Sequence, residues 1–282
     1  MKRHIPFIIL FLFAASTYAQ IEQNENDNDI HPEQLEEDEV AEEDELMIKA
    51  KSGDAEAQLL LAKSLDYGVQ REVNKKESLK WYLASAEQGN MEAQFFLGMH
   101  YYRGDGVERS LSEAAKWCRY SAEQGYDKAQ YTLGVCFAHG YGVSKSISDA
   151  IEWWRKSAEQ ENADAQCEIG IYYSKEDNEG YSPTEAVRWY QLSADQGNAR
   201  AQGYLGECYY EGNGVKRSYT EAVKWYKLAA AQGNHHAQNN LGVCYQNGQG
   251  VPKDETEAAR WFRLAARQGN KLAKGNLEAV SH

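Results

Sequence analysis

The stretch AQYTLGVCFAHGYGV, residues 129–143, has the pattern of an amphipathic helix that glycines interrupt. Its apolar residues are four positions apart, which places them along one face of a helix that we name helix A. These residues are Ala129, Leu133 and Phe137. Gly140 and Gly142 end the helix and begin a loop. Gly134 lies in its middle, where a glycine costs about 1 kcal/mol relative to alanine, so the pattern predicts close packing against another element.

The stretch is one copy of a unit that repeats every 36 residues. The dipeptide Ala-Gln recurs at this step, beginning at positions 57, 93, 129, 165, 201 and 237. A tryptophan column keeps the same step, with the members Trp81, Trp117, Trp153, Trp189, Trp225 and Trp261. A fixed period of about 20 to 50 residues is typical of solenoid proteins, in which stacked units share a core. We therefore predict tandem helical hairpins from about residue 54 to the end, without a domain boundary.

A second helix, helix B, has a start signal in every unit. A small polar residue is followed three residues later by an acid, which favours the positive helix end and, when it is Glu, can bond back to the cap amide. The six cap residues are Asn74, Ser110, Ser146, Ser182, Ser218 and Asp254. Pro183 suits the first helical position. In most units helix B ends at a glycine followed by Asn, which can cap the next helix. Glu161 replaces that glycine in the third unit, where we expect a strained or frayed turn.

A glycine column runs through the middle of helix A. Its members are Gly98, Gly134, Gly170, Gly206 and Gly242, matched by Ala62 in the first unit. We expect helix B to approach helix A closely at these positions, with the tryptophan column across the gap. Burial of each aromatic ring, at roughly 2 to 3 kcal/mol, offsets the helix cost of the glycine.

The motifs A-Q-x-x-L-G-x-x-Y, G-x-G-V, A-x-x-W-Y and A-x-Q-G together resemble the Sel1-like repeat, a helical hairpin related to the tetratricopeptide repeat. The resemblance covers about residues 54–274 in six units, although G-x-G-V is degraded in units one and four. It implies an all-α solenoid of about six 36-residue helix-turn-helix repeats with capping helices. Residues 42–53 would form the N-terminal capping helix and residues 54–282 the solenoid. It further implies a scaffold that binds a partner protein or peptide on its concave face.

The first 19 residues have the basic start, apolar run and small-residue exit of a secretory signal peptide. Their apolar run is shorter than the ~20 residues that a spanning helix needs, which disfavours the alternative of an uncleaved membrane anchor. Residues 20–41 are acidic and poor in aromatics, so we expect a disordered leader. We therefore expect an exported protein, periplasmic or secreted, with no integral membrane segment after signal cleavage. A secreted factor that acts on a host cell is a further possibility.

The net charge of -13 is concentrated near the start of the chain. Residues 20–46 hold thirteen acidic residues and no Lys or Arg, and the remaining body is close to neutral. It offers no basic track for nucleic acid, so no nucleic-acid partner is expected. The acidic leader could steer a basic partner or act as a spacer, and the sequence does not choose between these roles.

The sequence lacks the motifs that would indicate catalysis. It has no Ser-x-x-Lys, as β-lactam enzymes require, no Gly-x-Ser-x-Gly, no His-Glu-x-x-His and no phosphate loop. His235 and His236 would project apart on a helix, and Cys136 with His139 would supply only two metal ligands. We predict no catalytic, cofactor-binding or metal-binding residues, and therefore no enzyme. The alternative from another class is a secreted or periplasmic enzyme that acts on cell-wall components.

The five cysteines are relevant because export permits disulfides. Cys208 and Cys244 hold equivalent positions in adjacent units, about 8 to 10 Å apart, which exceeds the ~7 Å limit for a bridge. They should therefore be unpaired. The expected register allows only Cys118 with Cys136, which are either a disulfide or two small buried side chains.

Helix A also has a face that is turned away from helix B. In units two and three this face is mostly apolar, and the candidate partner-binding residues are Phe95, Met99, Tyr102, Tyr131 and Val135. Such a patch is suited to a peptide or a partner helix. The alternative, weighed equally, is that these side chains fill gaps between neighbouring units. Asp at positions 99 and 131 should abolish partner capture with little loss of helicity if the patch is a binding surface.

Overall fold

The computed structural model describes residues 45–280, and the structural statements below refer to that part of the chain. It contains fourteen helices and no strand, and the first helical stretch is at residues 45–51. The other thirteen are α3 (Ala55–Tyr67), α4 (Lys75–Glu87), α5 (Met91–Arg103), α6 (Leu111–Glu123), α7 (Asp127–His139), α8 (Ile147–Ala158), α9 (Ala163–Ser174), α10 (Pro183–Asp195), α11 (Ala199–Glu211), α12 (Tyr219–Ala231), α13 (His235–Asn247), α14 (Glu255–Arg267) and α15 (Lys271–Val280).

Several expected segments lie wholly or partly outside the described residues. The signal peptide at residues 1–19, the leader at residues 20–41 and the first residues of the capping helix at 42–53 belong to this group. Their boundaries, and the end of the solenoid at residue 282, stay predictions. All contacts discussed below lie within the compact unit Lys49–His282.

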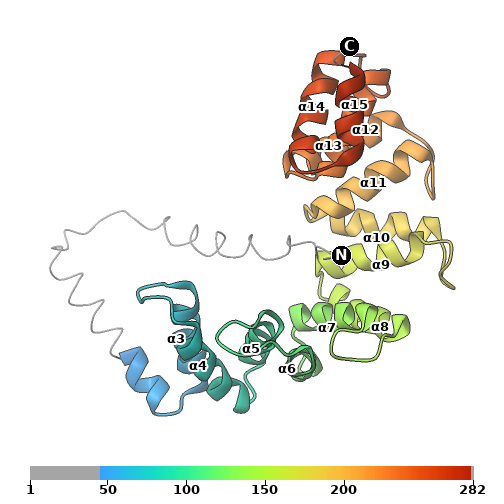
Figure 1. The fold of residues 1–282 in the computed structure, drawn as a ribbon. Coiled ribbons are helices and arrows are strands. Elements are labelled where there is room, and N and C mark those ends of the chain that lie inside the picture. Colours follow the sequence, from blue (N-terminus) through green and yellow to red (C-terminus); the bar gives the residue numbers. More distant parts are fainter. Residues whose placement is uncertain (1–44, 281–282) are drawn as a thin grey trace, which may run out of the picture. The chain divides into compact units, whose positions relative to one another are not determined.

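The helices form six consecutive hairpins. From α3 to α13 the odd-numbered helices are helix A of each repeat, and from α4 to α14 the even-numbered helices are helix B. From α3 to α15, consecutive helices pack against one another, as Figure 1 shows, and α11 also contacts the A helices α9 and α13. The helix α15 adds a further helix A after the sixth hairpin. The predicted all-α solenoid of 36-residue hairpins is therefore confirmed.

All six predicted caps of helix B form. In each repeat the cap side chain accepts a hydrogen bond from the backbone amide three residues later. The amide of Glu77 donates to Asn74 Oδ1 at 3.1 Å, and the amide of Glu257 donates to Asp254 Oδ1 at 2.9 Å. Pro183 is the first residue of α10, as predicted.

The tight turns between repeats also follow the sequence. Asparagine side chains cap the following helix A at Asn90, Asn162, Asn198, Asn234 and Asn270. The glycine before this position has a positive φ in the other turns, from 87° at Gly233 to 97° at Gly125. Glu161 takes its place in the third repeat with φ of 63°, which L side chains rarely adopt. The predicted strain at this turn is therefore confirmed.

The glycine column provides close packing, but the expected partner was wrong. A Cβ built on Gly134 would lie 2.4 Å from Cδ1 of Trp154, and one built on Gly206 would lie 2.6 Å from Cδ1 of Tyr226. The side chains that face the glycine column thus come from the residue after each column tryptophan. Adjacent residues on a helix point about 100° apart, so only one of the two columns can face helix A. The column that does so is buried and contains Tyr82, Cys118, Trp154, Tyr190, Tyr226 and Phe262.

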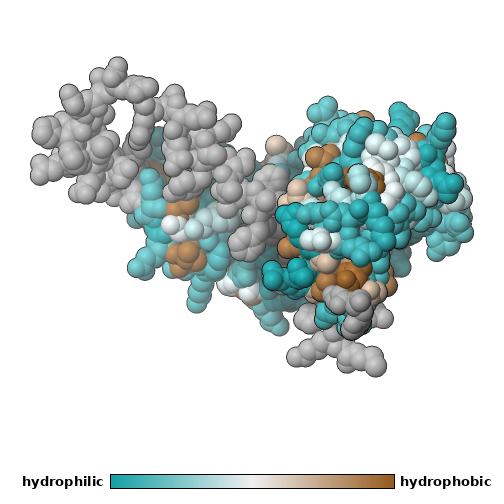
Figure 2. All heavy atoms as spheres, turned by 90° about the horizontal axis from the view of Figure 1, so that it is seen from above, coloured by the Kyte–Doolittle hydropathy of each residue, from teal (hydrophilic) through white to brown (hydrophobic). Residues whose placement is uncertain are grey.

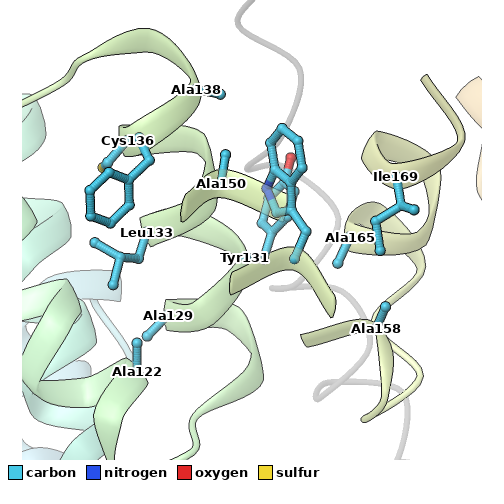
Figure 3. Packing of buried hydrophobic residues seen from close by; sticks show 12 residues of the cluster. Ala122, Ala129, Tyr131, Leu133, Cys136, Ala138, Ala150, Ala158, Ala165 and Ile169 are labelled. Carbon is cyan, nitrogen blue, oxygen red and sulfur yellow. The ribbon is translucent and has the colours of Figure 1, made fainter. Parts of the chain in front are cut away.

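The tryptophan column packs between repeats and is half-buried. Trp225 of α12 packs against a cluster from α10 and α11, and Trp261 of α14 packs against a cluster from α12 and α13. Trp189 packs in the same way against the cluster that Figure 3 shows, which combines side chains of α7, α8 and α9 such as Leu133 and Ile169. The tryptophans therefore join each hairpin to the one before it.

The second glycine of G-x-G-V allows each loop to pack closely against the backbone of the preceding repeat. A Cβ on Gly214 would lie 2.2 Å from the carbonyl oxygen of Pro183, and Gly214 has φ of 73°. A Cβ on Gly142 would lie even closer to the carbonyl oxygen of Leu111. In the first repeat, Gln70 has the positive φ, at 59°, where the motif is degraded.

Glutamine pairs bridge neighbouring helices in all six repeats. Gln94 Nε2 donates to the carbonyl of Ala86 at 3.1 Å, and Gln94 Oε1 accepts from Gln124 Nε2 at 2.7 Å. The six pairs are Gln58–Gln88, Gln94–Gln124, Gln130–Gln160, Gln166–Gln196, Gln202–Gln232 and Gln238–Gln268. They satisfy buried amide groups at the turns and fix the register of the stacked repeats.

Candidate partner-binding surface

Four of the five predicted partner-binding residues are partly exposed. Phe95, Met99 and Tyr102 lie on α5, and Val135 lies on α7. Tyr131 is only 7% exposed and packs in the cluster that also holds residues of α8 and α9, as Figure 3 shows. Of the two alternatives that the sequence left open for Tyr131, the structure therefore supports gap filling, because its ring fills the space between neighbouring repeats.

Phe95 and Tyr102 also take part in packing between the second and third repeats. The Phe95 ring meets that of Tyr126 edge-on, with centroids 5.4 Å apart. The rings of Tyr102 and Tyr141 have centroids 6.4 Å apart, and the Arg109 guanidinium lies 5.6 Å from the Tyr102 centroid. Gap filling thus applies to both residues, and their contact with a partner stays a prediction.

Three half-buried apolar residues occupy one position on successive A helices, and we name them the apolar column. They are Met99 on α5, Val135 on α7 and Ile171 on α9. Lys63 precedes them at the equivalent position of the first repeat, and Glu207 follows them in the fifth. Ile171 was missed as a candidate, although the 36-residue step from Val135 indicates it.

Charged groups border the apolar column. Lys63 Nζ lies 2.8 Å from the Glu92 carboxylate, and Arg200 Nη1 lies 2.9 Å from the Glu168 carboxylate. Burial lowers the pKa of the Arg200 guanidinium, but Glu168, Cys167 and Tyr131 together raise this pKa above its ordinary value. Burial raises the pKa of the Glu207 carboxyl, and a second acid on α11 raises it further. The surface therefore combines an apolar centre with ion-paired and acidic margins.

Other exposed apolar side chains lie on A helices. Leu60 is 47% exposed and Tyr67 52% exposed on α3, and Tyr204 is 37% exposed on α11. Leu60 and Tyr67 are seven residues apart, a spacing that places them on one face of α3. Figure 2 shows one face of the molecule, where hydrophobic residues form small patches in a mainly hydrophilic surface.

The first two repeats share a buried polar cluster that the sequence reading missed. Asp66 Oδ1 lies 2.7 Å from Lys75 Nζ and 3.2 Å from His100 Nε2. His100 Nδ1 lies 2.9 Å from the carbonyl oxygen of Asp105. Burial raises the pKa of the Asp66 carboxyl, but the nearby Lys75 and His100 side chains together lower this pKa below its ordinary value. The sequence does contain an indication of this cluster, because His100 occupies a position where the later repeats have cysteine or tyrosine.

The Sel1 repeat family profile matches six consecutive segments, residues 55–90, 92–126, 127–162, 163–198, 199–234 and 235–270. These segments make up most of the chain. The chain belongs to the Sel1 repeat family. Sel1-repeat proteins generally act as protein-interaction scaffolds.

Two solved Sel1-repeat structures are similar to this chain. A protective antigen of uropathogenic Escherichia coli strains is 32% identical with a TM-score of 0.77, over 84% of this chain and 51% of that chain. A Sel1 repeat protein from Oxalobacter formigenes is 33% identical with a TM-score of 0.71, over 76% of this chain and 85% of that chain. The chain thus spans about half the length of the E. coli antigen. No curated protein matches the sequence.

In this Sel1-repeat chain, no three His, Cys, Asp or Glu side chains of residues 45–280 gather as a metal site. The rings of His235 and His236 have centroids 4.1 Å apart, so the expectation that they project apart was wrong. Cys136 is buried, whereas His139 is exposed and stacks on Tyr141 at 5.2 Å. Two potential ligands in such different surroundings do not form a site.

All five cysteines are free thiols. Cys118 and Cys136, which the sequence allowed to pair, are both buried and unbridged. Burial raises the pKa of the Cys136 thiol to about 11, which keeps it protonated and unreactive at neutral pH. Within the described range, every helix is too short or too polar to cross a membrane.

Proposed function

We propose that this Sel1-repeat protein is an exported scaffold that binds a partner protein or peptide through the apolar column. The observation that carries the proposal is the alignment of Met99, Val135 and Ile171 on three successive A helices, partly exposed and bordered by charges. The general role of the family supports the same function. Phe95 and Tyr102 extend the surface along α5.

The spacing of the column suits a helical partner. Packed neighbouring helices are about 8 to 10 Å apart, so column members recur at about that distance. A partner helix that lies across the A helices presents residues i and i+7 about 10.5 Å apart, because each residue rises 1.5 Å. Apolar side chains at that spacing would meet successive column members, as in helix-in-groove recognition.

The experiment is capture of partners from the cells that produce the protein, with Asp substituted into the apolar column. Met99→Asp and Ile171→Asp should each abolish capture of a partner that the unmodified chain retains, with unchanged helicity by circular dichroism. Leu228→Asp on α12 is the matched control, because Leu228 is 50% exposed on a B helix. Capture that survives both column substitutions would contradict the proposal, and loss of helicity would assign the column to the core.

Export is the second part of the proposal and is supported by residues 1–19 alone. Cell fractionation and N-terminal sequencing test it directly. The protein should be found in the periplasm or the medium with Gln20 at its start. A cytoplasmic chain that retains Met1 would contradict export but leave the binding surface untouched. The alternative of an enzyme that acts on cell-wall components has no observation in its favour among the described residues, and we do not propose it.

A further inference from the structure

A groove of about 440 Å³ lies on α4, the helix B of the first repeat. Its lining residues are Asn74, Lys76, Glu77, Lys80, Trp81 and Ala84. None of them belongs to the apolar column or to α5. Comparison with the other five repeats shows what opens this groove, because each lining position has five equivalents in the same chain.

The first difference lies three residues after Trp81, where the side chain is too small to cover the indole ring. In the second repeat, Tyr120 packs edge-on against Trp117 with ring centroids 5.6 Å apart and an interplanar angle of 83°. In the third, Lys156 Nζ lies 4.1 Å from the Trp153 ring centroid. Repeats four to six have leucine at this position. The first repeat has Ala84, which leaves the side of Trp81 open to the groove.

The second difference is an unpaired cation next to Trp81. In four other repeats the residue before the tryptophan forms a salt bridge with the acid three positions earlier, in the pairs Glu113–Lys116, Glu185–Arg188, Glu221–Lys224 and Glu257–Arg260. In the first repeat, Glu77 Oε2 instead accepts from Asn74 Nδ2 at 3.3 Å. Lys80 has no ion-pair partner among residues 45–280, so its ammonium group is available to a ligand.

The third difference is a second lysine. Lys76 lines the groove, whereas the equivalent positions are Ser112, Ser148, Thr184, Thr220 and Thr256. Lys76 also has no ion-pair partner in the described part of the chain. The groove is therefore lined by an aromatic ring, two ammonium groups without ion-pair partners among residues 45–280, and a single carboxylate that is already hydrogen-bonded.

We propose that this groove binds an acidic peptide segment that carries an aromatic side chain. The aromatic ring of the peptide packs on Trp81, as Tyr120 packs on Trp117 within the second repeat. Its flanking carboxylates lie next to the ammonium groups of Lys76 and Lys80. The ring supplies most of the buried apolar area, and the charges select acidic partners over basic ones. This site is separate from the apolar column, so the scaffold would have two partner-binding surfaces.

The test uses the full chain and short unlabelled peptides in titration calorimetry. The peptide EDYDE should bind, whereas EDSDE, without the ring, and KKYKK, with reversed charge, should each bind roughly tenfold more weakly or not at all. Binding should shift the indole resonance of Trp81, assigned through Trp81→Phe, and leave the other indole resonances in place. Equal binding of EDYDE and EDSDE, or no binding of EDYDE at millimolar concentration, would overturn the proposal.

Variants of the chain separate the groove from a general charge effect. Ala84→Tyr restores the residue that the second repeat has, so the chain should fold, and its internal ring should weaken EDYDE binding roughly tenfold. Lys80→Glu should also weaken it, whereas the matched control Lys224→Glu on α12 should not. Met99→Asp should leave peptide binding unchanged, which distinguishes this site from the apolar column. Wild-type affinity in Ala84→Tyr, or an equal loss in Lys224→Glu, would overturn the proposal.

Discussion

The first and fifth repeats share one backbone plan but differ in the side chains that fill it. In the fifth repeat, Gly206 leaves room for the buried ring of Tyr226, and the surrounding core is apolar. In the first repeat, Ala62 stands in the glycine column, Tyr82 is buried, and Asp66 brings a polar cluster into the interior. The difference teaches that the periodic positions hold the solenoid together, whereas departures from the period give single repeats their own properties.

The surfaces of these two repeats differ in the same way. Lys224 on α12 is paired with Glu221, and Leu228 follows three residues after the tryptophan. On α4, Lys80 is unpaired and Ala84 leaves a groove beside Trp81. In the fifth repeat, which keeps the pattern, side chains on helix B therefore cover the tryptophan and pair the cation. In the first repeat, which departs from the pattern, a groove remains that a ligand can bind.

The largest difference in stability between the two repeats is expected from substitutions in the glycine column. Gly206→Val should destabilise the protein by about 3 kcal/mol, because overpacking of a filled core adds to the poor helix propensity of valine. The new Cβ would lie 2.6 Å from a ring carbon of Tyr226. Urea unfolding measures the loss. Ala62→Gly in the first repeat is the control and should cost only about 1 kcal/mol; equal losses would mean that the column does not control packing.

Substitution in the polar cluster of the first repeat should cause the next largest loss of stability. Asp66→Ala should destabilise the first repeat by about 2 kcal/mol, because buried His100 and partly buried Lys75 both lose the carboxylate that lies next to them. Amide hydrogen exchange should locate the loss in α3 to α5. Gln246→Ala, at the equivalent position of the sixth repeat, should change stability by less than about 0.5 kcal/mol. A similar effect in both variants would remove the distinction between the cluster and an ordinary repeat.

Acid should weaken the first repeat more than the fifth. The pKa of the Asp66 carboxyl is lowered in the folded protein, since the nearby Lys75 and His100 side chains together outweigh the effect of burial. A depressed carboxyl pKa contributes stability that is fully present above the unfolded value of about 3.9 and is lost as the pH falls through the folded pKa. Hydrogen exchange measured between neutral and acidic pH should show α3 and α4 losing protection before α11 and α12. The opposite order would contradict the role of Asp66.

The loop glycines give a more local effect. Gly214→Ala should cost about 2 kcal/mol, because the residue has a positive φ and its Cβ would meet a backbone carbonyl. Gly197→Ala, with φ of 89° and open space around the new Cβ, should cost only about 1 kcal/mol. Thermal unfolding of both variants measures the difference. If Gly197→Ala costs as much as Gly214→Ala, the contact with Pro183 does not matter.

The smallest expected effect is a gain in stability from a substitution in the first repeat. Gln70 has φ of 59° where the fifth repeat has Gly214. Gln70→Gly should stabilise the protein by about 0.5 kcal/mol, because relief of the left-handed conformation exceeds the extra entropy of an unfolded glycine. Unfolding in urea should show a higher midpoint with an unchanged slope. A lower midpoint would show that Gln70 makes contacts worth more than its strain.

The elements that local chemistry determines could be predicted from the sequence. The N-caps, Pro183 and the strained turn at Glu161 depend on residues within one or two turns of a helix, and all appear as expected. The partner of the glycine column could not be predicted, because Trp153 and Trp154 are adjacent and only the crossing of two helices decides which faces Gly134. The sequence could not decide between a binding surface and gap filling for Tyr131 for the same reason, since its burial depends on the next repeat.

The most direct test of the scaffold function is photo-crosslinking from single positions in the cells that produce the protein. A photoreactive phenylalanine analogue placed at Met99 or Ile171 should form a covalent adduct with the same partner protein. The same analogue at Leu228, on the opposite helix of a repeat, should form no such adduct. Adducts of equal yield from all three positions, or from Leu228 alone, would contradict binding through the apolar column.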